Sequence, residues 1–138
     1  MNELEGMKEA FRESKQIFFT TTNKSGESHT RPMTNYNESP YQPMWFPSFL
    51  ETQKVEDVKA NSDVVISFPT DERGKWYRIK GNAKLAPWEE VHDKWKWWYL
   101  DWLPEEEREK HMFRYDNSFT DRTIIWVDPI EATIGNTK

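Results

Sequence analysis

Two short segments of this chain gather residue types that often act together in ligand binding. Residues 31–34 read Arg-Pro-Met-Thr and residues 45–48 read Trp-Phe-Pro-Ser, with Thr52, Gln53 and Lys54 close behind. An arginine presents a planar fork of N–H donors that fits phosphate oxygens, and a lysine adds a compact positive charge. With the hydroxyls and the aromatic surface, these cations suit a ligand that has a phosphate at one end and a flat ring at the other.

Arg31 lies in a stretch that the sequence predicts to be a β-strand. Alternation along a strand places His29, Arg31 and Met33 on one face and the residues between them on the other. A mid-strand arginine among apolar neighbours is costly unless it is paired. Two interpretations remain open here, a salt bridge to an acidic neighbour or a guanidinium aimed at a phosphate. Pro32 lacks a backbone N–H, which leaves the carbonyl side of the strand free to approach a ligand.

Thr52 and Lys54 lie where a helix is expected to begin. A helix N-terminus offers free N–H groups and a partial positive charge, so a hydroxyl and an ammonium there would complete an anion site. Ser48, just upstream, could add another donor. Taken alone, the two residues are better explained as an ordinary threonine cap and a solvated lysine. Their combination with Arg31 and the aromatic 45–46 segment favours the anion site.

Periodicity and turn signals predict the elements that must position these residues. The sequence predicts an amphipathic helix over 2–14, strands over 16–22, 27–36 and 41–47, a short helix over 52–60, strands over 64–68 and 75–85, helices over 88–102 and 105–115, and a last strand over 123–134. Tight turns between strands make an antiparallel sheet the expectation, and six such strands tend to close into a small barrel. We expect a mainly β fold with peripheral helices in one domain spanning 1–138, with a helical insert at about 87–115.

Prolines and valines refine this prediction. Pro43 and Pro47 cannot donate to a strand ladder, so the third strand is expected at a sheet edge. Val55 and Val58 should face the core from the short helix. The last strand should bend near 128–129, which reads Asp-Pro.

Composition excludes several classes of function. A net charge of −5 argues against nucleic-acid binding, which needs clustered positive charge. Cysteine is absent, so disulfides and cysteine-ligated metals are excluded, and the three histidines, His29, His92 and His111, lack metal-ligand spacing. No apolar run is long enough to span a membrane, and the N-terminus lacks the features of a signal peptide. A cytoplasmic protein without a metal or a membrane partner is the expectation.

The chain is rich in tryptophan, with 8 in 138 residues. Trp88, Trp95, Trp98 and Trp102 fall on one stripe of a predicted helix, which is most simply explained by packing against the barrel. The segment 94–98 also mixes basic and aromatic residues as single-strand nucleic-acid binders do. The acidic residues around it and the negative net charge disfavour that interpretation.

A whole-chain resemblance joins these segments. The matching stretches are 17–21 with 25–26, 29–33, 45–46, 52–55, 64–68, 77–83 and 128–129. Their order and spacing resemble the FMN-binding split-barrel family related to pyridoxamine 5′-phosphate oxidase, and most closely its short general stress protein 26-like branch. The resemblance implies a six-stranded antiparallel split β-barrel that forms a homodimer, with FMN held in clefts at the subunit interface.

The resemblance also implies roles for individual residues. Arg31 and Lys54 would bind the phosphate, helped by Thr52 and Ser48. The backbone of 32–34 and 45–47 would line the isoalloxazine ring. The full set of implied cofactor-binding residues is Arg31, Pro32, Met33, Thr34, Trp45, Phe46, Pro47, Ser48, Thr52, Gln53 and Lys54, together with Trp95 and Trp98 of the insert, one of which would stack beside the partner's flavin.

Two departures from the family pattern limit the function that is implied. Trp76 stands where the oxidases proper carry a flavin-contacting glutamine, and residues 134–138 lack their substrate-binding Arg and His. We therefore expect a flavin-dependent oxidoreductase with an unknown small-molecule substrate or electron donor rather than a vitamin B6 oxidase. No side chain stands out as a general acid or base. The alternatives are a non-catalytic flavin- or haem-binding module, a stress-related ligand-binding module, and a deazaflavin or FAD in place of FMN.

Overall fold

Six strands and three helices make up the described part of the chain. The computed structural model describes the backbone of residues 1–101 and 122–138, and the side chains of 1–94 and 122–138. The elements are α1 (Met7–Glu13), β1 (Gln16–Thr22), β2 (Ser28–Thr34), β3 (Met44–Phe49), α2 (Gln53–Ala60), β4 (Asp63–Pro69), β5 (Trp76–Leu85), α3 (Trp88–Asp101) and β6 (Arg122–Gly135). The strands form one antiparallel sheet in the order β2-β1-β4-β5-β6-β3, which confirms the predicted mainly β fold.

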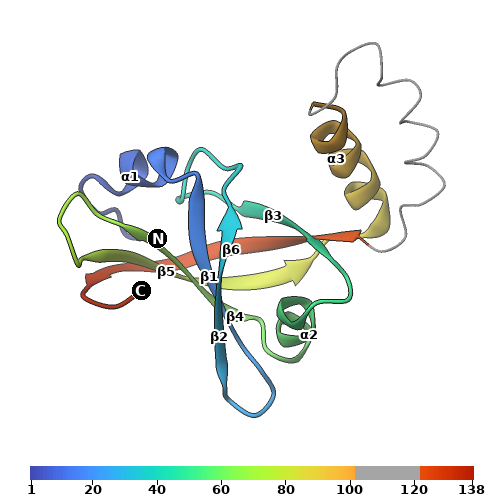
Figure 1. Cartoon of the computed structure of the whole chain (residues 1–138), viewed down its shortest axis with the longest axis horizontal. Helices are drawn as coiled ribbons and strands as arrows, with labels where there is room; N and C mark the ends of the chain where they lie inside the picture. The colour runs from blue at the N-terminus through green and yellow to red at the C-terminus, as the bar shows by residue number, and fades with distance from the viewer. Residues whose placement is uncertain (102–121) are drawn as a thin grey trace.

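The sheet curls on itself (Figure 1) and encloses the main cluster of buried apolar side chains. Side chains alternate along β1, so Ile17 and Phe19 are fully buried while their neighbours are not. Phe19 then meets Phe46 of β3 edge to face, with ring centroids 5.3 Å apart. Because β1 and β3 are not neighbours in the sheet, this contact across the interior joins its two halves. β2 and β3 remain as the two edge strands, as expected for β3 from its prolines.

The predicted bend near residues 128–129 is present as an irregularity between β5 and β6. Gly81 pairs with Pro129, whereas Lys80 pairs with Glu131, so β6 has one extra residue at this point. A Cβ on Gly81 would clash with Cγ1 of Val127, which explains why this position suits glycine.

The first helix is shorter than the predicted 2–14. It begins at Met7 because Gly6 has a left-handed backbone conformation, with φ of 77°. A right-handed helix cannot continue through such a residue toward the N-terminus. Met7 and Phe11 are buried, and the Phe11 ring packs edge to face on Phe68 of β4 at 5.3 Å. Helix α1 therefore closes one end of the core.

The third strand begins three residues later than predicted, at Met44, and continues to Phe49. Tyr41 lies in the preceding turn, where its hydroxyl donates a hydrogen bond to the carbonyl oxygen of Leu4. The short helix α2 follows at Gln53, and Val55 and Val58 face the core as expected.

Helix α3 packs outside the barrel, beyond the ends of β5 and β6 (Figure 1). Val91 is buried against Ile124 of β6, with Trp45 and Trp126 partly buried around them. The helix predicted over 105–115 lies outside the described residues. Among the helices that are described, none is long and apolar enough to cross a membrane.

Candidate functional site

The two cations singled out from the sequence lie on neighbouring elements. Arg31 is on the edge strand β2, and Lys54 is in the first turn of α2. Burial lowers the pKa of Lys54 from its usual value, and the positive charge of Arg31 lowers it further. Within the described residues Lys54 makes no ion pair. Two partly buried positive charges that repel each other favour an anion between them.

Arg31 is anchored by its neighbours and keeps donors free. Its Nη1 donates to Oγ1 of Thr21 at 2.8 Å and to the carbonyl oxygen of Phe19 at 3.3 Å. Its Nη2 lies 3.9 Å from Oδ2 of Asp57, too far for a hydrogen bond. Burial lowers the pKa of Arg31, while Asp57 raises it. The acidic neighbour that a salt bridge of Arg31 would need is therefore present as Asp57. Nη2 and Nε of Arg31 nevertheless make no hydrogen bond to any described residue.

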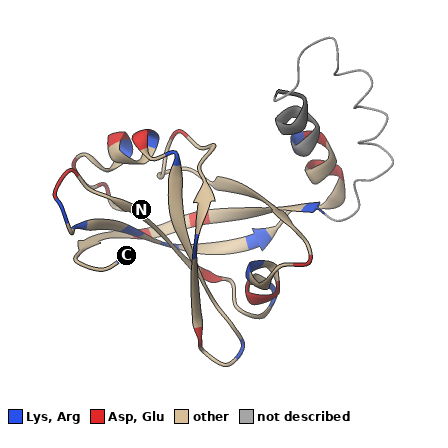
Figure 2. Ribbon diagram, viewed as in Figure 1, with Lys and Arg blue, Asp and Glu red and all other residues tan. Residues whose placement is uncertain are grey.

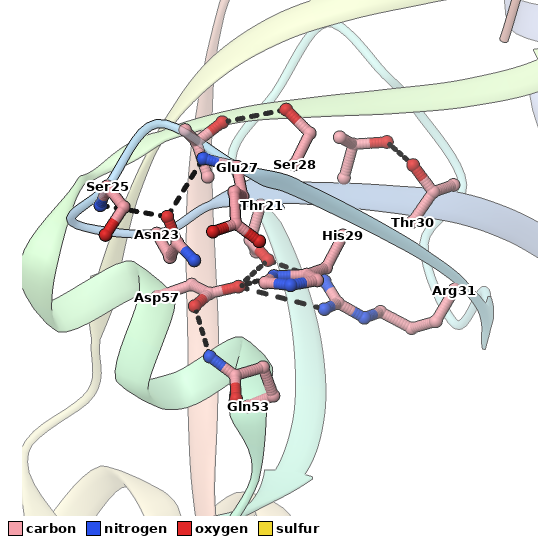
Figure 3. A network of polar contacts seen from close by, with 12 residues as sticks. Thr21, Asn23, Ser25, Glu27, Ser28, His29, Thr30, Arg31, Gln53 and Asp57 are labelled. Carbon is pink, nitrogen blue, oxygen red and sulfur yellow. Dashed lines mark hydrogen bonds and ion pairs between the residues drawn. The ribbon is translucent and has the colours of Figure 1, made fainter.

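Asp57 is the site residue that the sequence did not reveal. Its side chain is 1% exposed, and it accepts hydrogen bonds from Thr21 Oγ1 at 2.6 Å, Gln53 Nε2 at 2.7 Å and His29 Nδ1 at 2.9 Å. Figure 3 shows Thr21 and His29 reaching from the β1–β2 hairpin toward Asp57 on α2. The one signal in the sequence was the spacing of four between Gln53 and Asp57, which places both on one side of a helix.

The start of α2 lacks the predicted threonine cap. Oγ1 of Thr52 donates to the carbonyl oxygen of Phe49 at 2.9 Å, and it makes no hydrogen bond to the amides of the helix. Ser48 is buried, and its hydroxyl also donates to Phe49, at 3.2 Å. A helix leaves the N–H groups of its first turn without intrahelical acceptors. In the first turn of α2, which contains Lys54, no side chain caps these N–H groups.

The segments expected beside a flat ring lie on the two edge strands. On β2, Pro32 and Thr34 are exposed and Met33 packs against the core. On β3, Phe46 is fully buried and Pro47 is half-buried.

The backbone of Trp45 is already hydrogen-bonded. Its N–H donates to Oδ1 of Asn37 at 3.0 Å, and its carbonyl oxygen accepts from Nδ2 of Asn37 at 3.0 Å. The Trp45 ring stacks on Tyr36, with centroids 5.5 Å apart, and Nζ of Lys94 lies 4.6 Å from the ring centroid. A cavity of about 440 Å³ borders this stack and is also lined by Lys8 and Arg12 of α1.

Three tryptophans of the sequence analysis need separate comment. The side chains of Trp95 and Trp98 lie outside the described residues. Trp76, expected at the position of a glutamine in the oxidases proper, packs edge to face on Phe18 of β1 with centroids 5.6 Å apart. In the described part of the chain, no three His, Asp or Glu side chains are grouped to hold a metal ion.

Both acidic and basic residues are spread over the described ribbon (Figure 2).

The chain matches the sequence model of one protein family, and several solved structures share its fold. A family model described as "Pyridoxamine 5'-phosphate oxidase like" matches residues 2–115. No curated protein shows significant sequence similarity to the chain.

Solved structures with this fold cover nearly the whole chain. A Listeria innocua protein provisionally named a pyridoxamine 5′-phosphate oxidase aligns with a TM-score of 0.68 at 21% identity, over 94% of each chain. A protein named F420 reductase aligns with a TM-score of 0.65 at 21% identity, over 95% of this chain and 98% of its own. A Clostridium acetobutylicum protein related to general stress protein 26 aligns with a TM-score of 0.64 at 16% identity, over 93% of this chain and 84% of its own. These alignments confirm the predicted split barrel.

Proposed function

The chain belongs to the pyridoxamine 5′-phosphate oxidase-like family, and from this we propose that it binds FMN through Arg31 and Lys54 and acts as a flavin-dependent oxidoreductase. The observation that carries the proposal is the pair of partly buried cations beside the uncapped N-terminus of α2. A phosphate monoester carries two negative charges near neutral pH and accepts several hydrogen bonds. The two cations and the free N–H groups at this site are donors of the type that a phosphate accepts.

Each part of the site has a role in holding the cofactor. The free Nη2 and Nε donors of Arg31, the ammonium of Lys54 and the first amides of α2 would bind the phosphate. Ser48 and Thr52, whose hydroxyls lie 3.5 Å apart, would donate hydrogen bonds to the phosphate oxygens at its edge. The ring would lie along the edges of β2 and β3, where Pro32 and Pro47 have no N–H to donate.

The flavin, when bound, would supply hydride or electron transfer, and the protein would supply binding and orientation. The cavity of about 440 Å³ beside Tyr36 and Trp45 offers space for a small substrate or an electron donor near the proposed ring position. We further propose that two chains associate so that the partner covers the flavin, and that the protein works in the cytoplasm.

The proposal is tested by the absorbance of the protein. Wild-type protein incubated with FMN and then desalted should keep the visible spectrum of a flavin. The double variant Arg31→Ala/Lys54→Ala should lose it, because each lost charged hydrogen bond costs about 1.5–3 kcal/mol. Lys24→Ala, in the exposed turn of the β1–β2 hairpin, is the matched control and should keep the colour. A wild type that desalts to a colourless protein would overturn the proposal.

A related cofactor is a second candidate because a protein named F420 reductase shares the fold over 95% of this chain. F420 is a deazaflavin, with a flat ring and a phosphate of its own. Competition between FMN and F420 for the wild-type protein decides between them, and the cofactor that displaces the other at equal concentration is the ligand.

A binding function without turnover is the remaining alternative, since a fold does not determine a function. Steady-state assays with NADH and NADPH separate the two. Reduction of the bound flavin by either donor supports an oxidoreductase, and reduction by neither supports a flavin-binding module.

A further inference from the structure

A histidine and a buried carboxylate lie directly behind the proposed phosphate-binding arginine. The side chain of His29 is 36% exposed and that of Asp57 is 1% exposed, and His29 Nδ1 lies 2.9 Å from Asp57 Oδ2. The same oxygen accepts from Thr21 and lies 3.9 Å from Nη2 of Arg31 (Figure 3). The imidazole and the guanidinium therefore share one counter-charge.

The position of the proton on His29 follows from its partner. An ionised carboxylate only accepts hydrogen bonds, so a neutral His29 must carry its proton on Nδ1 and donate it to Asp57. A second proton would then enter at Nε2. Because the side chain is partly exposed, that nitrogen can exchange protons with water.

The charged groups around His29 leave the site one charge short of a phosphate monoester. Asp57 of α2 contacts His29, Arg31 lies 3.9 Å from the same carboxylate, and Lys54 interacts electrostatically with Arg31. Arg31, Lys54 and Asp57 together carry one net positive charge while the imidazole is neutral. The other acid of α2, Glu56, is paired with Lys59 at 3.5 Å on the exposed side of the helix.

The elements packed against α2 contribute no further charge from the core side. The inward side chains of β1 are Ile17, Phe19 and Thr21, and those of β5 near the helix are Ile79 and Ala83. A phosphate monoester is close to doubly ionised above about pH 6. One proton on the imidazole would bring the site to two positive charges and match it.

We propose that a phosphate monoester binds at Arg31 and Lys54 together with one proton, which His29 takes up at Nε2 while its Nδ1–H stays on Asp57. The inference rests on the proposed phosphate site. Asp57 acts as a positioning residue that fixes the tautomer of His29 and the place of Arg31. The proton comes from solvent, and no other bond is made or broken.

Proton uptake has a direct consequence for affinity. When one proton is linked to binding, the dissociation constant changes by about tenfold per pH unit. The Kd of FMN should therefore rise with pH above neutrality in the wild type. In His29→Gln, which can keep an amide hydrogen bond to Asp57, the rise should be markedly smaller.

Isothermal titration calorimetry in buffers of different ionisation enthalpy measures the proton directly. At about pH 7.5, where the phosphate ester is almost fully ionised, FMN binding to the wild type should take up a large fraction of one proton. Uptake should fall to near zero in His29→Gln and persist in His92→Gln, a control outside the site. Riboflavin, which lacks the phosphate, should bind without proton uptake. Thermal melting checks that each variant is folded.

The outcomes separate this inference from the proposed function. FMN binding without proton uptake, or uptake that persists in His29→Gln, overturns the inference and leaves the FMN site intact. Phenyl phosphate, a monoester without the flavin ring, serves as the second probe. Its binding with proton uptake supports the inference even if FMN does not bind, whereas binding of neither probe overturns both proposals.

Discussion

Asp57 makes the short helix α2 part of the candidate site. Three side chains donate hydrogen bonds to its carboxylate, and Arg31 lies 3.9 Å away. An isolated buried carboxylate would be costly, and these partners explain how this one is tolerated. They come from β1, β2 and α2, so a single residue fixes the relative positions of three elements.

The pKa of Asp57 predicts how its contribution to stability depends on pH. Burial raises this pKa, but hydrogen bonds from Thr21, Gln53 and His29 outweigh burial and lower it below its ordinary value. A carboxyl with a lowered pKa in the folded state stabilises the protein above its unfolded pKa, about 3.9. That stabilisation is lost as the pH falls through the folded pKa.

Asp57→Asn should therefore lower the free energy of unfolding by about 1–3 kcal/mol at neutral pH. The difference from the wild type should shrink as the pH falls below about 4. Urea denaturation over a pH series measures both effects. The exposed Asp63→Asn serves as the control and should stay within about 0.5 kcal/mol of the wild type. A penalty for Asp57→Asn that is unchanged in acid would show that the charge of Asp57 is not the cause.

The cations of the site were predictable from the sequence, and their partner was not. Arg31 and Lys54 stood out because each lay at a position, mid-strand or at a helix start, that suits an anion. Asp57 did not, because an acidic residue in an amphipathic helix is usually on the solvated face. Only the packing of α2 under the β1–β2 hairpin shows that it is buried.

At the scale of the elements, the side chain of Asn37 hydrogen-bonds to the backbone of the edge strand β3. The amide of Asn37 accepts from the N–H of Trp45 and donates to its carbonyl oxygen, both at 3.0 Å. This pair of bonds imitates a neighbouring strand at a residue of β3 that would otherwise present an open donor and acceptor at the sheet edge. It holds the strand from which Phe46 reaches the core.

Removal of this amide should loosen the edge. Asn37→Ala should lower the free energy of unfolding by about 1–3 kcal/mol, since two hydrogen bonds of about 0.5–1.5 kcal/mol each are lost. Hydrogen exchange at the Trp45 amide should become faster. Asn37→Asp keeps the acceptor but not the donor, so in that variant the amide should stay protected. Equal protection of Trp45 in Asn37→Ala would show that the strand does not depend on this pair.

Strand positions were predictable and strand ends were less so. The run of aromatic and β-branched residues gave β1 its observed bounds, Gln16–Thr22. The ends of α1 and β3 were missed because they depend on distant contacts. A Cβ on Gly6 would lie 3.1 Å from the Tyr77 hydroxyl, and Tyr41 is held in its turn by Leu4. Neither contact can be inferred from local periodicity.

At the scale of the whole molecule, the split in the barrel brings the site to the two edge strands. The sheet order leaves β2 and β3 each with one unpaired edge. Arg31 and the proposed ring surface lie on these two strands, and α2 follows β3 directly in the chain. A flavin bound there would be exposed on one side, which is why we propose that a second chain covers it.

Light scattering with size-exclusion chromatography tests that proposal. FMN-loaded protein should have twice the 16.7 kDa mass of one chain, with one flavin per chain. A flavin-loaded protein with the mass of a single chain would show that one copy suffices to hold the cofactor.

The barrel as a whole followed from the sequence because six strands joined by tight turns have few ways to bury their apolar faces. The irregularity opposite Gly81 was expected near the correct residues. The sequence predicted the family but not the specific function. Solved structures at 21% identity share the fold, and a shared fold does not determine which ligand is bound.

The relative affinity of wild-type protein for FMN and riboflavin tests the central claim most directly. The two ligands differ only in the phosphate, so the ratio of their dissociation constants isolates the contribution of the phosphate contacts, whose charged members are Arg31 and Lys54. Two charged contacts of about 1.5–3 kcal/mol each predict a preference for FMN of roughly a hundredfold or more. That preference should disappear in Arg31→Ala/Lys54→Ala. Equal affinities in the wild type, or a preference that survives the loss of both cations, would contradict a phosphate site at these residues.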